Sequence, residues 1–110
     1  MNTSYFSKSS KNPNAVSIAR SSPVWYTGQE YKKLAPSYNL LMKYKNDGDQ
    51  EYYIKKYNEE VLDKLNPSEV FKELGSEAIL LCWEGPKKFC HRHLVANWFE
   101  NKLGIKLQEI

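Results

Sequence analysis

The sequence has few cysteines and no long apolar run, and each absence removes a class of protein. Two cysteines in 110 residues are too few for the disulfide framework of a small secreted domain, so we expect reduced thiols and a cytoplasmic location. No apolar run approaches the roughly 18 residues of a membrane span, and the chain opens without the segments of a signal peptide. We therefore expect no membrane partner.

The composition that is present is that of an ordinary globular chain. Hydrophobic residues make up 41% and charged residues 26%, which predicts one domain over residues 1–110 and excludes disordered and collagen-like classes. The net charge is +3, below the strongly basic balance of dedicated nucleic-acid binders. A charge of this size still permits an anionic partner.

Hydrophobic periodicity predicts strands that alternate with helices along the chain. The expected strands are residues 3–6, 15–20, 77–83 and 105–110. The expected helices are residues 37–44, 50–65, 66–75 and 90–103, with a polar turn at 7–14 and an irregular aromatic-rich loop at 24–36. This order predicts a mixed α/β fold with a mostly parallel sheet.

Two predicted strand ends nominate a binding site before any motif is considered. In open parallel sheets, ligands bind outside the carboxyl ends of the strands. Here these ends carry Arg20 and Ser21 after one strand, and Cys82 and Glu84 after another. Arg20 at this edge can bind an anion with two hydrogen bonds, or it is a solvated charge.

The densest group of reactive residues is Cys82-x7-Cys90-His91-Arg92-His93, which holds both cysteines and both histidines. Cys90 is expected at a helix N-terminus, where unpaired N–H groups favour a thiolate. His91 or Arg92 can add positive charge beside it.

The same helix start also predicts an anion site. Its N–H groups would combine with Arg92 and with Lys87 or Lys88 to hold a phosphate or carboxylate. Phosphatase or rhodanese chemistry is disfavoured, because no glycine follows Cys90 before Gly104 and the Cys-x5-Arg spacing is missing.

Two other interpretations of this segment stay open. In a structural role, both cysteines pack as small hydrophobic residues and Arg92 pairs with Glu84 or Glu100. In a zinc site, Cys82, Cys90, His91 and His93 are the four candidate ligands, although zinc sites usually show tighter pairs.

Aromatic residues raise a second set of alternatives. Trp25, Tyr26 and Tyr31 either wall a pocket by stacking on a flat ligand or complete the core. Lysines and tyrosines alternate at residues 31–33, 43–45 and 53–57, a pattern that can bind single-stranded nucleic acid but also suits an amphipathic helix.

Two segments resemble a known family. Residues 80–96 (Leu-Leu-Cys-Trp-Glu, five residues, then Cys-His-Arg-His-Leu-Val-Ala) are similar to the hallmark of the domain-of-unknown-function 488 family. Residues 17–23 (Ser-Ile-Ala-Arg-Ser-Ser-Pro) resemble its second segment, and Trp25-Tyr26-x-Gly28 resembles its compact branch. Ile18 stands where that family usually has an acidic residue.

The resemblance implies a single three-layer Rossmann-like α/β domain, without an established reaction, whose marked residues gather at one sheet end. By matching motif it points to the same positions as the strand ends do: Arg20, Cys82, Glu84, Cys90, His91 and Arg92.

The leading hypothesis is a domain that binds an anionic small molecule or nucleotide, with thiol-dependent chemistry as an option. Cys90 and Glu84 are the candidate catalytic residues, and no metal or cofactor is assigned. The candidate ligand-binding residues are Arg20, Ser21, Trp25, Tyr26, Cys82, His91 and Arg92. The alternatives are a nucleic-acid-binding module that uses the Tyr/Lys surface, and a protein-interaction domain with structural cysteines.

Overall fold

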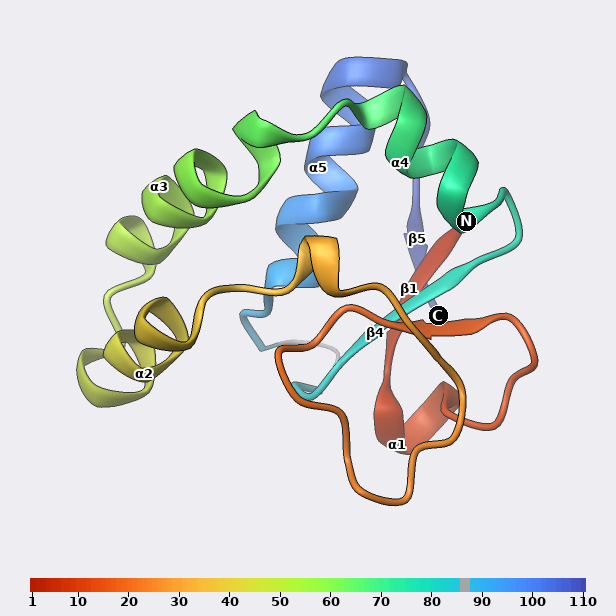
Figure 1. Ribbon diagram of the computed structural model, residues 1–110, viewed down its shortest axis with the longest axis horizontal. Coiled ribbons are helices and arrows are strands. Elements are labelled where there is room, and N and C mark those ends of the chain that lie inside the picture. The colour runs from red at the N-terminus through yellow and green to blue at the C-terminus, as the bar shows by residue number, and fades with distance from the viewer. Residues whose placement is uncertain (86–87) are drawn as a thin grey trace.

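A parallel sheet organises the chain (Figure 1). The computed structural model describes residues 1–85 and 88–110, so the predicted anion-site lysine Lys87 lies outside the described residues. The sheet has the strand order β3-β2-β4-β1-β5, and every neighbouring pair is parallel, so the predicted mostly parallel sheet is confirmed. Its strands are β1 (Asn2–Tyr5), β2 (Ala15–Ser17), β3 (Gln29–Glu30), β4 (Ile79–Cys82) and β5 (Gln108–Glu109).

The helices begin and end at the residues that favour such boundaries. Ser37, Asp49 and Asn66 accept N-cap hydrogen bonds, and Gly48 and Gly104 end helices in the left-handed conformation. The helices are α1 (Phe6–Ser9), α2 (Tyr38–Asp47), α3 (Gln50–Glu60), α4 (Pro67–Leu74) and α5 (His91–Leu103), with 3₁₀ turns η1 (Lys32–Leu34) and η2 (Leu62–Lys64).

The sheet separates two unequal apolar layers, which confirms the three-layer α/β class. Leu80 of β4 faces the larger core, which α2 to α5 cover. Its neighbours Ile79 and Leu81 face the opposite side, where Phe6 of α1 and Tyr26 pack against them. This alternation along β4 is the period of two that a strand imposes. Both faces of the central strand are therefore buried.

Several predicted boundaries were wrong. The predicted helix 50–65 ends at Glu60, because Val61, with φ −117° and ψ −70°, departs from the α-helical dihedral angles and is followed by the 3₁₀ turn η2. Residues 7–9 of the predicted polar turn belong to α1, and Phe6, predicted as the end of the first strand, is the buried first residue of that helix. The predicted aromatic-rich loop contains the strand β3, which pairs with β2. Both residues of β3 are exposed, so no apolar pattern indicated a strand there.

The carboxyl ends of β2 and β4 come to the same edge of the sheet, as expected for parallel neighbours. Residues 16 and 17 align with residues 80 and 81, and Arg20 follows three residues after β2 ends. Helices α2 and α3 lie at the left of Figure 1, beside the end of β4. Among the described helices, none is long and apolar enough to span a membrane.

Candidate functional site

A pocket of about 440 Å³ lies at this edge of the sheet, between α2 and the start of α5. Six of the residues predicted from the strand ends and the motif line it: Arg20, Ser21, Cys82, Glu84, Cys90 and His91. The rest of its wall is supplied by Ala19, Pro36, Tyr38, Leu41, Met42, Tyr44, Lys45, Tyr53, Trp83 and Phe89. The fold thus brings the ends of β2 and β4 to one cavity.

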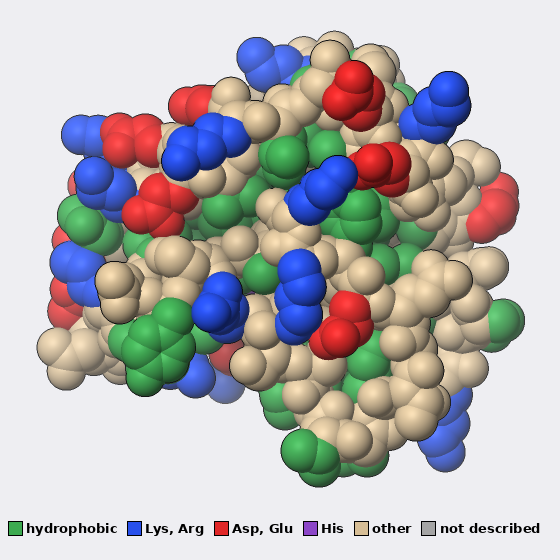
Figure 2. All heavy atoms as spheres, viewed as in Figure 1, with side chains coloured by type: hydrophobic (Ala, Val, Ile, Leu, Met, Phe, Trp, Pro, Cys, Tyr) green, Lys and Arg blue, Asp and Glu red, His purple; other side chains and the backbone are tan. Residues whose placement is uncertain are grey.

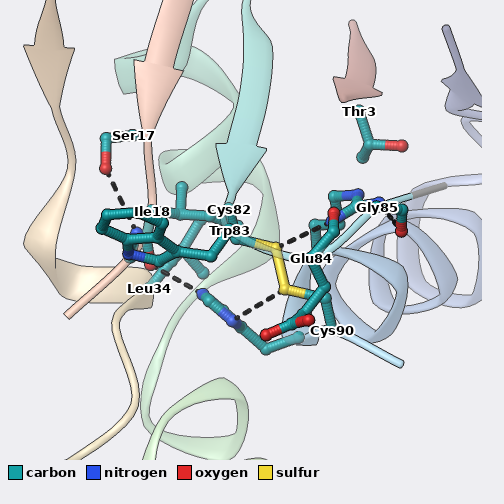
Figure 3. The surroundings of a disulfide bond; sticks show 12 residues. Thr3, Ser17, Ile18, Leu34, Cys82, Trp83, Glu84, Gly85 and Cys90 are labelled. Atoms are coloured by element: carbon teal, nitrogen blue, oxygen red, sulfur yellow. Dashed lines mark hydrogen bonds between the residues drawn. A yellow bond between two sulfur atoms is a disulfide. The ribbon is translucent and has the colours of Figure 1, made fainter. Parts of the chain in front are cut away.

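Cys82 and Cys90, which both line this pocket, are joined by a disulfide bond (Figure 3). This corrects the expectation of two reduced thiols. Cys82 ends β4 and Cys90 is the N-cap residue of α5, so the fold places the two residues side by side. Both side chains are buried, with 1% and 7% of their surface exposed.

His91 is held in one tautomer beside the sulfur atoms. Its Nε2 lies 2.7 Å from the carbonyl oxygen of Ile18, so Nε2 donates a proton to it and Nδ1 carries the free lone pair. Nδ1 lies 3.7 Å from the sulfur of Cys90. Burial lowers the pKa of His91 to about 4, so this ring does not supply the positive charge expected beside the thiol.

Arg92 differs most from its expected place. Its side chain is fully buried and does not line the pocket. Nε and Nη2 donate to the carboxylate of Glu109 at 3.0 and 2.8 Å. Nη1 donates to the carbonyl of Glu84 at 2.8 Å and to the sulfur of Cys82 at 3.1 Å, and Nη2 also reaches the carbonyl of Gly85.

Arg92 therefore ties the loop after β4 to β5, with Glu109 as its anion. The sequence suggested Glu84 or Glu100 for this ion pair, and nothing in the local pattern of the last strand marks Glu109. The pairing exists because β5 adds to β1 with Glu109 opposite Thr3, whose hydroxyl donates to the same carboxylate at 2.6 Å.

Acid is expected to weaken this ion pair. Burial raises the pKa of Glu109, but the hydrogen bonds from Arg92 and Thr3 outweigh it, and the pKa lies below its ordinary value. The stabilisation is then complete above the unfolded pKa of about 4.3 and is lost as the pH falls through the lower folded pKa. We expect the urea midpoint to fall more between pH 5 and pH 3 in the native protein than in Glu109→Gln. The nearby His93 is present in both proteins, so the comparison isolates the carboxylate. An equal fall in both proteins would contradict this assignment.

Arg20 and Ser21 occupy the other rim of the pocket. Trp83 Nε1 donates to the carbonyl of Ser21 at 2.7 Å and ties the two strand-end loops together. Arg20 is exposed, and its guanidinium makes no hydrogen bond or ion pair with the residues that the structure describes. Lys45 of α2, which belongs to the lysine/tyrosine segment 43–45, also lines the pocket.

Trp25 and Tyr26 do not line this pocket but a second one, which they form with residues 10–13, 15 and 27–29, so their binding role stays a prediction. The ring of Tyr26 packs on Phe6, and its hydroxyl donates to the carbonyl of Gln29 at 2.8 Å. Trp25 is 57% exposed. The aromatic wall comes instead from Tyr38, Tyr44, Tyr53, Trp83 and Phe89, which only the folding of α2 and α3 against β4 brings together.

The lysines and tyrosines of the alternating segments largely contact other parts of the protein. Tyr53 and Tyr57 are in the core. Lys43 pairs with Asp47 and lies 3.9 Å from the ring centroid of Tyr52. Figure 2 shows basic and acidic side chains interspersed over one face of the molecule. Nucleic-acid binding stays a prediction that no observation here favours.

The fold and this edge define a small parallel α/β domain with a cysteine pair under an aromatic, cationic pocket. A family model described as "Active DUF488-N3 subclade" matches residues 8–103, and the chain belongs to this DUF488 family. The comparisons with curated proteins and with solved structures found no match. Both resembling segments, 17–23 and 80–96, lie within the matched residues.

Proposed function

We propose that the pocket at the ends of β2 and β4 binds a flat anionic small molecule of the nucleotide-like class in the cytosol. The observation that carries the proposal is the charge of the lining. Arg20 and Lys45 have no ion-pair partner among the described residues, whereas Glu84 is the one acid in the lining. Two cations against one acid give the lining a net positive charge, to which the neutral His91 adds nothing.

The walls suit a planar ring. Tyr38 and Trp83 are both more than half exposed, and the partly buried Tyr44 and Phe89 also line the cavity. Aromatic faces bind planar groups by stacking, and about 300–1,000 Å³ is the usual range for small-molecule sites. A cavity of about 440 Å³ lies within that range.

The anionic part of the ligand would be held at the rim. A guanidinium donates two parallel hydrogen bonds to a phosphate or carboxylate, and Arg20 stands where ligands of open parallel sheets bind. The proposal includes no covalent step, because the sulfur of Cys90 is bonded to Cys82. Glu84 is then a residue that orients the ligand rather than an acid or base.

Removing the rim arginine is expected to weaken nucleotide binding. We expect at least one of the common ribonucleoside 5′-monophosphates to bind, and Arg20→Ala to lower its affinity about 10–100-fold, because a hydrogen bond to a charged group contributes about 1.5–3 kcal/mol. Isothermal titration calorimetry measures both affinities. The uncharged nucleoside and inorganic phosphate are each expected to bind more weakly than the monophosphate.

The matched control is Lys64→Ala, which removes an exposed lysine of η2 that does not line the pocket. It lowers the net charge by the same amount and should leave the affinity unchanged. Absence of binding by every monophosphate, or equal affinities of the Arg20→Ala and Lys64→Ala proteins, would overturn the proposal.

A further inference from the structure

We propose that Cys82, Cys90 and His91 form a binding site for one thiophilic divalent cation, of which Zn²⁺ is the representative, when the disulfide is reduced. The two sulfur atoms and an imidazole nitrogen all lie within 4.8 Å of one another. Three ligands of this kind with an open fourth position are the Cys₂His set of some catalytic zinc sites. The inference does not depend on what else the pocket binds.

The orientation of His91 is the first argument for a metal ligand. Metal-binding histidines usually donate their second ring N–H to a carbonyl or carboxylate, which fixes the tautomer. The hydrogen bond from Nε2 to the carbonyl of Ile18 does this and leaves the Nδ1 lone pair beside the Cys90 sulfur. His93 is not in the cluster, so only one of the two histidines is a candidate ligand.

The spacing of the backbone is the second argument. The Cα atoms of Cys82 and Cys90 are 7.0 Å apart, whereas disulfides usually span about 4.4–6.8 Å. A zinc ion between two thiolates adds two bonds of about 2.3 Å each, so it bridges a wider separation than a disulfide does. The end of β4 and the start of α5 therefore lie at a distance that suits an intervening ion.

The surrounding donors favour two deprotonated sulfurs. Nη1 of Arg92 lies 3.1 Å from the Cys82 sulfur, where its N–H stabilises a thiolate. Cys90 is the N-cap residue of α5, at the positive end of the helix dipole. Two thiolates neutralise one divalent cation, so the buried complex carries no net charge of its own.

The site faces the pocket rather than the core. All three proposed ligands line the cavity, so the fourth position of a tetrahedral ion is open to a water molecule or a pocket ligand. Glu84 lies on the same wall with an exposed side chain. The arrangement is that of an accessible metal site and not of a closed structural one.

Reduction precedes binding. A dithiol reductant supplies two electrons and two protons to the bond between the sulfurs, and is itself converted to a cyclic disulfide. Both cysteine thiols then release their protons to water as the cation binds. The oxidised protein has no thiolate to offer, so binding follows the redox state of the pair.

Cobalt(II) is the probe for the test, because thiolate ligands give it a charge-transfer absorption band. The protein is reduced, and the reductant is then removed under anaerobic conditions. The protein is titrated with Co²⁺ and afterwards with Zn²⁺ as a competitor. We expect the band to appear with one Co²⁺ per chain, Zn²⁺ to displace it, and the oxidised protein to show none.

Variants separate this site from others. Cys82→Ser should abolish two-thiolate binding, and His91→Gln should weaken Co²⁺ binding at least about tenfold. His93→Gln is the matched control, since it removes the other histidine of α5, and it should titrate like the native protein. Circular dichroism shows whether each variant folds; if the Cys82 variant does not, the reduced and oxidised native proteins provide the comparison. No band in the reduced native protein, or an equal effect of His91→Gln and His93→Gln, would overturn the proposal.

Discussion

Replacing Arg92 by methionine is expected to lower the free energy of unfolding by about 3 kcal/mol, because breaking a buried ion pair typically costs about 3–5 kcal/mol and Glu109 is partly solvated. Arg92 is fully buried, and the Glu109 side chain is 25% exposed. The methionine fills much of the same volume but donates no hydrogen bond. The carbonyl of Glu84 loses the hydrogen bond from Arg92, whereas the carbonyl of Gly85 keeps the one from the Lys88 N–H and the Glu109 carboxylate keeps only the one from Thr3.

Urea unfolding measures this cost, and the chain offers a matched control. Arg20 is the only other arginine, and it is exposed without a described partner. Arg20→Met should change the free energy of unfolding by no more than about 0.5 kcal/mol. If Arg92→Met and Arg20→Met had the same urea midpoint, Arg92 would not be the structural tie that its contacts indicate.

A double-mutant cycle identifies the partner. Glu109→Gln removes the negative charge but leaves one oxygen that accepts a hydrogen bond. If the two side chains interact, the cost of Arg92→Met should be smaller in the Glu109→Gln background than in the native protein. Equal costs in both backgrounds would assign the energy to the carbonyls of the loop after β4 instead.

The elements with strong local signals were predictable from the sequence. Capping residues and a glycine stop fixed α2, α4 and α5 to within a few residues, and the apolar run around Leu80 predicted β4. β3 gave no such signal, because Gln29 and Glu30 are exposed and form a strand through the pairing of their backbone with β2. A strand of this kind is specified by its neighbour rather than by its own residues.

The candidate site was predictable where it depends on strand ends. Parallel strands with crossover helices place their carboxyl ends together, which brought Arg20 to Cys82 and Glu84. The direction of a side chain does not follow from that rule. Arg92 faces β5 because Glu109 lies on this strand, which pairs with β1. This pairing joins the two ends of the chain and has no local sequence signature.

Reduction of the Cys82–Cys90 bond is expected to lower the free energy of unfolding by about 2.5 kcal/mol, the chain-entropy value for a loop of this size. The cysteines are eight residues apart in sequence, so the cross-link restricts a short segment of the unfolded chain. Urea unfolding with and without a dithiol reductant, in a metal-chelating buffer, measures the difference. The chelator keeps a bound cation from replacing the cross-link.

A double variant isolates the effect of the bond from other effects of the reductant. Cys82→Ser with Cys90→Ser removes both sulfurs, and its urea midpoint should not respond to reductant. When reductant is present, the urea midpoint of the native protein should fall towards that of the double variant. Identical midpoints of the native protein in both conditions would show that the bond between the end of β4 and the start of α5 does not stabilise the fold, and Arg92 would then be the main tie between these segments.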